Sequence, residues 1–438
     1  MKTEDRQKSQ KISLFTAICI VVANMIGTGV FTSLGFQVKD IQSGFSLLFL
    51  WLVGGIFALC GALAYSELGA AMPRSGGEYH YLSNIYHPAL GFLSGWLSVT
   101  VGFAAPIAAA AMALGQYFSS VVPILAPKAI ALFIVIAVSL LHTQNLKLGS
   151  SFQQVFTLLK ILLIVILIVC GFLLATPQDI GFLPSPEDPS LIFSAPFAIS
   201  MVYVTYSYSG WNAAIYLASE IENPEKNLPR SLLVGTAIVM VLYLLLNLIF
   251  LYSTPIDKLA GQLEIGYIAA NQIFGINGAK IMGILISFGL ISSISSMVLT
   301  GPRVTQVIGE DIPIFQILAK KNVKGIPATA IFFQLAIVLF FVITATFESV
   351  ITYLGFTLTL SSFLTVLGVF IYRMRYPEIL RPYKTWGYPI TPLIFLGISL
   401  WILIFVFQGK PIESLAGLGT IALGLPVYFI AARKKIVS

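Results

Sequence analysis

The sequence predicts an all-α membrane protein with twelve transmembrane helices, because of its composition and its long apolar runs. Of its 438 residues, 57% are hydrophobic and only 10% are charged, whereas soluble domains carry roughly 25% charged residues. A soluble globule could not bury so much apolar surface, but a bilayer accommodates it because its interior is itself apolar. The 36 glycines also suit membrane helices, whose backbones approach one another closely.

Twelve apolar runs supply the predicted helices. A spanning helix needs about 20 largely apolar residues, and the length and continuity of the runs favour helices over strands. The fourth run is short, so its helix can begin a few residues before the run itself. The runs cover residues 13–35, 43–70, 88–119, 129–142, 152–174, 191–219, 230–252, 280–306, 327–346, 349–373, 389–407 and 414–432.

The stretches between the runs are too short for a soluble domain, so we expect residues 1–438 to form a single integrated unit. The stretch 253–279 has room for short surface helices. With the N-terminus inside, the inner loops and tails carry most of the Lys and Arg residues and the outer loops carry few. The positive-inside rule then places both termini in the cytoplasm. We expect an integral protein of a bacterial plasma (inner) membrane.

Several other classes of protein are disfavoured. The net charge is +7, but the basic residues lie between apolar runs and not on a basic, aromatic-rich helix, so no nucleic-acid partner is expected. The histidines, His80, His87 and His142, are scattered and predict no metal site. No nucleophile–base pair, phosphate-binding loop or zinc spacing occurs, which argues against an enzyme, a cofactor or an ATP-driven pump.

The cysteines Cys19, Cys60 and Cys170 all lie inside apolar runs. In that setting a cysteine acts as a small packing residue. No predicted outer loop carries one that could be joined to another chain. We therefore expect neither a structural disulfide nor a disulfide-linked partner subunit.

Two of the runs are interrupted near their middle. In the first run Gly27 and Gly29 flank Thr28, and glycine weakens a helix, although small residues also suit a close helix crossing. The sixth run is broken by a cluster of tyrosines, serines and a glycine at residues 206–212, which can equally serve packing. Helices 1 and 6 begin two five-helix halves, and paired interruptions of this kind indicate a substrate site at the membrane midplane.

Such a break has a specific chemistry. Where the first helix restarts after Gly29, the N–H groups of its first turn lack partners and form an anion site at the positive end of the helix dipole. Where a helix stops, freed carbonyl groups can accept hydrogen bonds from an ammonium group. An amino acid carries a carboxylate and an ammonium on one carbon and therefore fits both.

Six short motifs follow one another along nearly the whole chain. They are Gly27-Thr28-Gly29-Val30-Phe31, Pro73-Arg74-Ser75-Gly76-Gly77-Glu78-Tyr79, Gly91-Phe92 through Gly95-Trp96, Ser209-Gly210-Trp211-Asn212, Glu220-Ile221-Glu222-Asn223-Pro224 with Leu228-Pro229-Arg230, and Arg381-Pro382-Tyr383 near Gly387-Tyr388-Pro389. In this order they resemble the amino acid–polyamine–organocation superfamily, and within it the L-type amino-acid transporter group.

The resemblance implies a fold and a substrate site. The fold is that of the leucine transporter: two inverted five-helix repeats, at residues 13–174 and 191–373, and two additional helices at 389–432. The substrate carboxylate would bind the N–H groups of Thr28, Gly29 and Val30, and the amine would bind the carbonyls of Met25, Ile26, Tyr206 and Ser209. Asn212 matches a position that supports the site. Apart from the resemblance, the hydroxyl of Ser207 would make the surroundings of the site modestly polar.

Lys160 is the one lysine well inside an apolar run, where a charge is costly. It can snorkel toward the cytoplasm or point into the bundle near the first break. The resemblance favours the second, because a lysine here is similar to the one that fills the sodium site of sodium-coupled relatives. Sodium should then not drive transport. Lys160 would act in coupling by releasing its proton when desolvated, or it would stay charged and stabilise the break, as suits an exchanger.

Other polar residues in the runs leave more than one interpretation. Glu67, near the inner end of the second run, is expected to meet a partner at a helix interface. The serines of the eighth run can line the substrate pocket or bond to backbone carbonyls. They are Ser292, Ser293, Ser295 and Ser296.

The expected function is secondary active transport of L-amino acids by alternating access, as sodium-independent exchange or proton-coupled symport. A small or neutral substrate is favoured, since no acidic residue and no spare arginine lies deep in helices 3, 6, 8 or 10. An amine or polyamine transporter would need acidic ligands. A non-transporting amino-acid sensor would need signalling motifs that the short tails lack. The expected partners are the substrate, the lipid bilayer and, for a symporter, protons.

Overall fold

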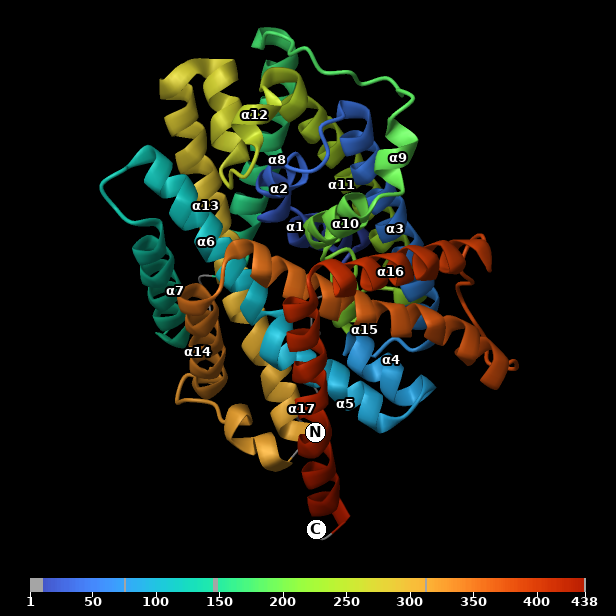
Figure 1. The fold of residues 1–438 in the computed structure, drawn as a ribbon. Helices are drawn as coiled ribbons and strands as arrows, with labels where there is room; N and C mark the ends of the chain where they lie inside the picture. The colour runs from blue at the N-terminus through green and yellow to red at the C-terminus, as the bar shows by residue number, and fades with distance from the viewer. Residues whose placement is uncertain (1–10, 75, 145–148, 312, 437–438) are drawn as a thin grey trace.

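The computed structural model describes residues 11–74, 76–144, 149–311 and 313–436. Apart from an isolated parallel β-bridge between Ile12 and Ile221, these residues form helices, turns and loops and no strand. The predicted all-α class is therefore confirmed for this part of the chain, and Figure 1 shows how the helices are arranged.

Helices lie at all twelve predicted runs, and the first, third and sixth runs are divided into shorter pieces. The part up to the fifth run contains α1 (Leu14–Met25), the 3-10 turn η1 (Gly29–Phe31), α2 (Ser33–Gln37), α3 (Gly44–Ala71), α4 (Gly77–Ile85), α5 (Pro88–Leu97), the π-helical turn η2 (Ser98–Gly102), α6 (Ala104–Val121), α7 (Pro127–Gln144) and α8 (Gly149–Leu174).

The remaining part continues in the same way. It contains α9 (Asp188–Ile192), α10 (Ala195–Tyr208), the 3-10 helix η3 (Ala213–Glu220), α11 (Pro224–Ser253), α12 (Ile256–Leu259), α13 (Ile265–Asp311), the 3-10 helix η4 (Pro313–Ala319), α14 (Ala328–Thr344), α15 (Phe347–Arg375), α16 (Ile390–Gly409) and α17 (Pro411–Ile436).

Nine helical stretches of the described chain are long and apolar enough to cross a membrane. The helices α1 and α14 are apolar but shorter, and α10 has only 14 residues. The protein is an integral membrane protein, while twelve crossing helices in two inverted repeats stay a prediction.

Local sequence sets where several helices begin. The hydroxyls of Ser13, Ser43 and Ser194 accept hydrogen bonds from backbone N–H groups at the starts of α1, α3 and α10, as N-cap residues do. The helix at the fourth predicted run, α7, begins at Pro127, two residues before the run itself, since proline suits the first position of a helix. The short helices expected within 253–279 are confirmed by α12 and by the part of α13 before its kink at Gly275.

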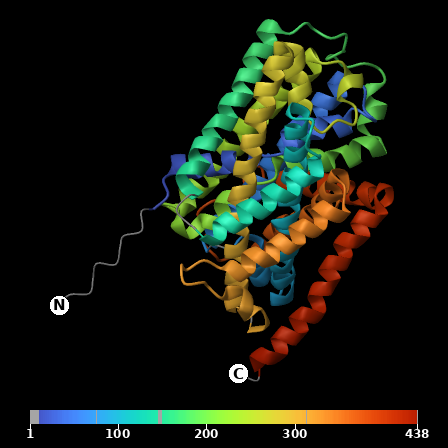
Figure 2. The same cartoon turned by 90° about the vertical axis from the view of Figure 1, so that its left-hand side faces the viewer.

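The two helix breaks lie near the centre of the bundle. Figure 1 shows α1, α2 and α10 in the middle, with α7 and α14 at one edge and α17 running down the lower middle of the view. In Figure 2 the outer position of α17 is clear, because the helix runs along the flank of the molecule. The outer helices α16 and α17 keep large apolar side chains exposed, among them Ile390, Ile412 and Phe429, as a surface in contact with lipid requires.

Glu67 in α3 joins three separate parts of the chain. Its carboxylate accepts a bidentate pair of hydrogen bonds from Arg373 of α15, at 2.8 and 2.6 Å. It also accepts hydrogen bonds from the backbone N–H and the hydroxyl of Thr385, at 2.6 and 2.7 Å. Arg381 lies 3.6 Å away as a second cation. The partner expected for Glu67 at a helix interface is thus confirmed.

We expect Glu67→Ala to destabilise the protein by about 3–5 kcal/mol, because it leaves two guanidinium groups without their buried counter-charge. Thermal unfolding in detergent, followed by loss of the monodisperse species, measures this. Lys410→Ala is the matched control: it breaks the half-exposed ion pair with Glu348 and should cost about 1 kcal/mol or less. Equal losses in the two variants would contradict the structural role of Glu67.

Candidate functional site

The first predicted break lies where the glycines indicated. The helix α1 ends at Met25, and the chain resumes helical structure as the 3-10 turn η1 at Gly29. The α-helix α2 begins only at Ser33. The predicted restart after Gly29 is therefore confirmed, but it is a 3-10 turn first and an α-helix only from Ser33.

The N–H groups of the break are available for a ligand. Phe31 donates to the Thr28 carbonyl and Thr32 to the Gly29 carbonyl, both at 3.1 Å. None of the hydrogen bonds found within the described residues uses the N–H of Thr28, Gly29 or Val30. Three successive unpaired N–H groups next to a helical turn can bind a carboxylate.

The second break meets the first. The helix α10 ends at Tyr208, Gly210 turns the chain with φ of 97°, and η3 follows from Ala213. A Cβ on Gly210 would lie 2.9 Å from the carbonyl carbon and oxygen of Asn24, and a Cβ on Gly29 would lie 2.5 Å from the Cα of Ser207. Each break thus presses a glycine against the backbone of the other. The close-crossing interpretation of the first run and the helix break are both correct.

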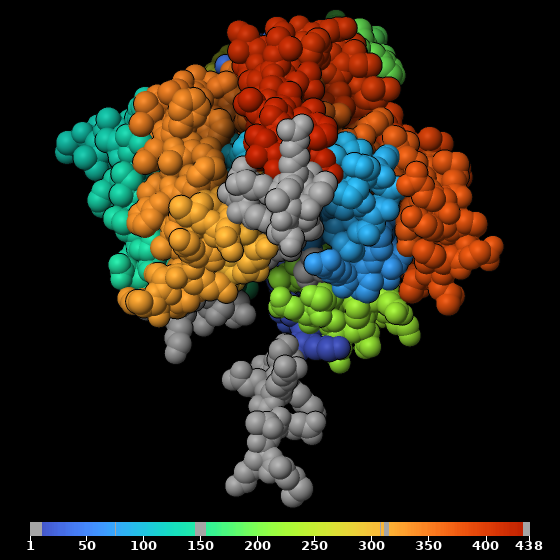
Figure 3. Space-filling view, turned by 90° about the horizontal axis from the view of Figure 1, so that it is seen from below, coloured from blue at the N-terminus to red at the C-terminus, as the bar shows by residue number. Residues whose placement is uncertain are grey.

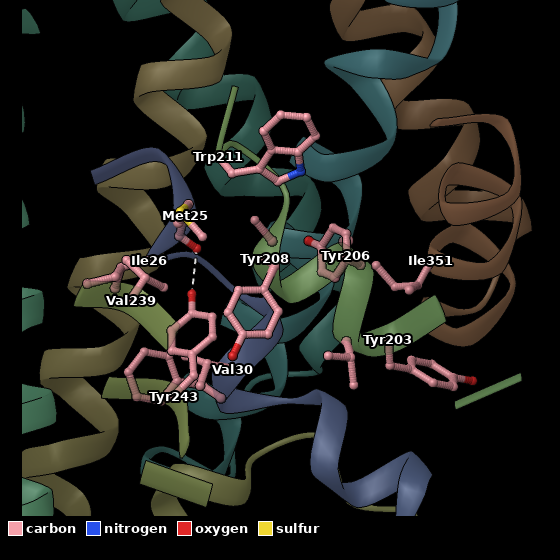
Figure 4. Packing of buried hydrophobic residues seen from close by; sticks show 14 of the residues in the cluster. Met25, Ile26, Val30, Tyr203, Tyr206, Tyr208, Trp211, Val239, Tyr243 and Ile351 are labelled. Atoms are coloured by element: carbon pink, nitrogen blue, oxygen red, sulfur yellow. Dashed lines mark hydrogen bonds between the residues drawn. The ribbon is translucent and has the colours of Figure 1, made fainter. Parts of the chain in front are cut away.

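The carbonyl groups at the end of α1 already accept hydrogen bonds from side chains. The Tyr243 hydroxyl of α11 donates to the Met25 carbonyl at 2.6 Å, as the dashed line in Figure 4 shows. The Lys160 ammonium donates to the Ile26 carbonyl at 3.2 Å. In the second break the Tyr206 carbonyl accepts from the Ser209 N–H at 3.0 Å. A carbonyl oxygen has two lone pairs, so each can take a further donor.

Lys160 points into the bundle. Its side chain is buried, with 8% of the residue exposed. Besides the Ile26 carbonyl, its ammonium donates to the Ser293 hydroxyl of α13 at 2.7 Å. Snorkelling toward the cytoplasm is thereby excluded, and the lysine joins α8, α13 and the end of α1. The Ser293 hydroxyl also donates weakly to the Gly289 carbonyl, at 3.4 Å, so this serine serves both of the roles considered for it.

A small cavity adjoins the break and Lys160. It lies between the first break, α8 and α13. Apart from Lys160 and Ser293 its lining is apolar or glycine, and it contains Gly27, Phe31, Leu163, Leu285, Ile286, Gly289 and Leu290. No carboxylate contributes to it. The two breaks therefore bring unpaired backbone donors and acceptors together, with a buried ammonium and a small apolar space beside them.

Comparison with known proteins identifies the family of the chain. A family model described as an amino acid permease matches residues 12–423. The chain belongs to the amino acid permease family. The permease is 26% identical over 440 residues to the b(0,+)-type amino acid transporter 1 of Mus musculus, covering 98% of this chain and 89% of that protein. It is 27% identical over 432 residues to the large neutral amino acids transporter small subunit 2 of Mus musculus, covering 96% and 81%.

The family confirms the resemblance seen in the motifs, and these relatives are amino acid transporters. The human b(0,+)-type amino acid transporter 1 is similarly related, at 27% identity over 446 residues. The bacterial membrane, the cytoplasmic termini and the lack of a disulfide-linked subunit stay predictions for the permease. Its cysteines lie in α1, α3 and α8.

Two of the predicted site residues engage other side chains in the permease. The Ser207 hydroxyl donates to the Tyr203 carbonyl at 2.7 Å and lies 2.9 Å from the Ser33 hydroxyl of α2, so it ties the two breaks together. The Asn212 amide donates to the Glu78 carboxylate at 2.8 Å. It therefore supports the second break from the side of α4.

Tyr243 also contacts the first break, and the motifs of the sequence did not single it out. It is fully buried and packs against Tyr208 and Trp51, and Figure 4 shows its ring directed toward Met25. The signal was present: a tyrosine in the middle of the apolar run 230–252, where a hydroxyl needs a partner. Which carbonyl it would meet depends on how α11 packs against α1, and that is not readable from the run.

Proposed function

We propose that the protein is a secondary active transporter of L-amino acids that works by alternating access. The carboxylate of the substrate binds the unpaired N–H groups of Thr28, Gly29 and Val30. Its ammonium binds the carbonyls of Met25, Ile26, Tyr206 and Ser209. The observation that carries the proposal is the contact of two helix breaks, which offers backbone donors and acceptors within one site. Amino acid transport by the relatives supports it.

Tyr243 and Lys160 donate the hydrogen bonds that the substrate ammonium would otherwise donate; we call this their stand-in role. Each donates to a carbonyl that the substrate would use. These donors satisfy buried carbonyls, and a buried carbonyl left unpaired would cost about 1–3 kcal/mol. The substrate ammonium shares or replaces these two hydrogen bonds. Substrate binding thereby changes the hydrogen bonds that join α1 to α8 and α11. This gives the site a way to couple occupancy to the position of α1.

The lining of the site favours a small neutral substrate. The cavity beside the break contains no carboxylate that could pair with a cationic side chain, and an amine or polyamine would lack the acidic partners it needs. Lys160 supplies the positive charge where a sodium ion would otherwise help to bind. Transport is therefore sodium-independent, by exchange or by proton symport.

Counterflow in proteoliposomes tests the proposal. The vesicles are loaded with a mixture of neutral amino acids, and traces of labelled amino acids are added one at a time, without sodium and at varied pH. Uptake that needs internal substrate and ignores a pH gradient identifies an exchanger. Uptake into empty vesicles driven by an inward proton gradient identifies a symporter. If no amino acid moves under either condition, the proposed substrate class is wrong.

Tyr243→Phe is expected to lower the unfolding temperature of the substrate-free protein, since the Met25 carbonyl loses its donor while the ring packing is kept. A saturating amino acid should stabilise the variant more than the wild type, because the ammonium then satisfies that carbonyl. Thermal unfolding with and without substrate measures both effects. Tyr252→Phe, a change near the end of the same helix, is the control. Equal stabilisation of wild type and Tyr243→Phe would count against the stand-in role.

A further inference from the structure

The start of α4 makes contacts with η3 that lie outside the proposed carboxylate and ammonium positions. Gly77 adopts φ of +56° at the start of α4. A Cβ on Gly77 would lie 2.4 Å from the ring of Tyr216 in η3. The glycine thus lets the first turn of α4 press against η3, the helix that continues the second break.

Glu78, in that first turn, holds three side chains from two other elements. Its carboxylate accepts hydrogen bonds from the Tyr65 hydroxyl of α3 at 3.1 Å, from the Asn212 amide at 2.8 Å and from the Tyr216 hydroxyl at 2.6 Å. Only 9% of Glu78 is exposed. None of the ion pairs found in the described part of the chain includes it. It is a buried carboxylate held by neutral donors.

Further contacts join the parts of the chain around Glu78. The ring of Tyr65 meets Trp211 of the second break edge-on, with centroids 4.7 Å apart. Ile12, just before α1, donates to the Glu220 carbonyl and accepts from the Glu222 N–H, both at 2.9 Å. Seen from below in Figure 3, α4, the region around η3 and the start of the described chain lie side by side. This is the side that the positive-inside rule predicts to be cytoplasmic.

We propose that Glu78 is a positioning residue that holds η3 in the closed arrangement of the inner gate. The proposal rests on the proposed transport function, because a gate implies a passage. When η3 moves away from α3 and α4, Asn212 and Tyr216 leave the carboxylate, and water replaces them. Because a buried carboxylate without a cation also loses solvation, the exchange of donors for water changes the free energy only modestly. The contacts of Glu78 therefore favour the closed arrangement but still allow η3 to move away.

This arrangement links the gate to the site through one residue. Asn212 lies at the end of the second break, two residues after Gly210, and its amide reaches Glu78. A shift of the break that pulls Asn212 away removes one of the donors that keep η3 in place. Occupancy of the site and closure of the inner gate are thereby connected by a direct contact.

Glu78→Gln tests the proposal, because it keeps the shape and removes the charge. Cys19→Ser, Cys60→Ala and Cys170→Ser supply a background without cysteine, and Ala214→Cys places a thiol in η3 at a fully buried position. A membrane-impermeant maleimide is added to inside-out vesicles, and the labelling rate is measured. We expect Glu78→Gln to raise the rate on the order of ten-fold, as weaker bonds to a formerly charged acceptor require. Glu225→Gln, an exposed carboxylate on the same side, should leave it unchanged.

One further readout and two further variants separate positioning from a general loss of structure. In counterflow, Glu78→Gln should change the KM measured from the inner side more than that from the outer side, whereas a misfolded fraction would lower the rate from both sides equally. Glu78→Asp should restore part of the slow labelling, because it returns the charge. Tyr216→Phe removes one donor and keeps the ring, and it should raise the labelling rate to an intermediate value.

Two labelling results would contradict the proposed role of Glu78. If Glu78→Gln and Glu225→Gln label at the same rate, Glu78 does not hold the gate. If Glu78→Gln does not fold, Tyr216→Phe decides, and wild-type labelling of that variant overturns the proposal. Labelling needs no transport. A wild-type protein that moves no amino acid but shows the expected labelling therefore contradicts the transport function and leaves the role of Glu78 supported.

Discussion

Replacing Lys160 by Ala is expected to lower amino-acid counterflow by about a hundred-fold or more, since hydrogen bonds from a charged donor contribute about 1.5–3 kcal/mol each. The ammonium makes two such bonds, to the Ile26 carbonyl and to the Ser293 hydroxyl. Without it the end of α1 loses its contact with α8 and α13, and a buried carbonyl is left unpaired. The substrate then meets a break that is no longer held in the binding geometry.

Lys128→Ala is the matched control for this experiment. Lys128 also donates to a backbone carbonyl, that of Ile343, but on the exposed surface, so its loss should leave counterflow near the wild-type value. Initial rates are compared at equal amounts of folded protein in the vesicles. A wild-type rate in Lys160→Ala would contradict every role suggested for this lysine. If the wild type is a proton symporter, the variant should also lose uptake driven by a pH gradient, which separates coupling from binding.

The positions of the helices were predictable from the sequence because the bilayer limits which backbone structures can cross it. A run such as 43–70 has to be a helix, since lipid offers no partner for an open backbone, and α3 covers Gly44–Ala71. The breaks were predictable as well, because glycine next to a small polar residue interrupts an otherwise apolar helix. What the pattern could not give was the kind of turn at the restart, where η1 precedes α2.

The contacts of the site were less predictable than its location. Lys160 drew attention because a charge within an apolar run needs a partner, and the partner, Ser293, was one of several serines in a distant run. Tyr243 and Glu78 gave a weaker signal, because a tyrosine in an apolar run or a glutamate between two runs is common. Their importance comes from packing between helices far apart in the chain, on which a single sequence carries no information.

Gly29→Ala is expected to abolish transport and to destabilise the protein by about 1–3 kcal/mol, as overpacking does. From the sequence alone, a larger residue here would act by blocking the approach of the substrate. The structure adds a second cause. A Cβ on Gly29 would meet the Oγ and Cα of Ser207 at 2.4 and 2.5 Å, so the two breaks would have to separate. The N–H groups of the first break would then lose their alignment with the second.

Gly27→Ala isolates that cause, because it makes the same change two residues away. A Cβ on Gly27 has only the Met25 carbonyl within 4 Å, at 3.9 Å, so this variant should fold and unfold at the wild-type temperature. Thermal unfolding and counterflow are measured on both variants. If Gly29→Ala were as stable as Gly27→Ala and still transported, the contact between the breaks would not be what shapes the site. If Gly29→Ala alone loses both stability and transport, the crossing of the two breaks is the element on which binding depends.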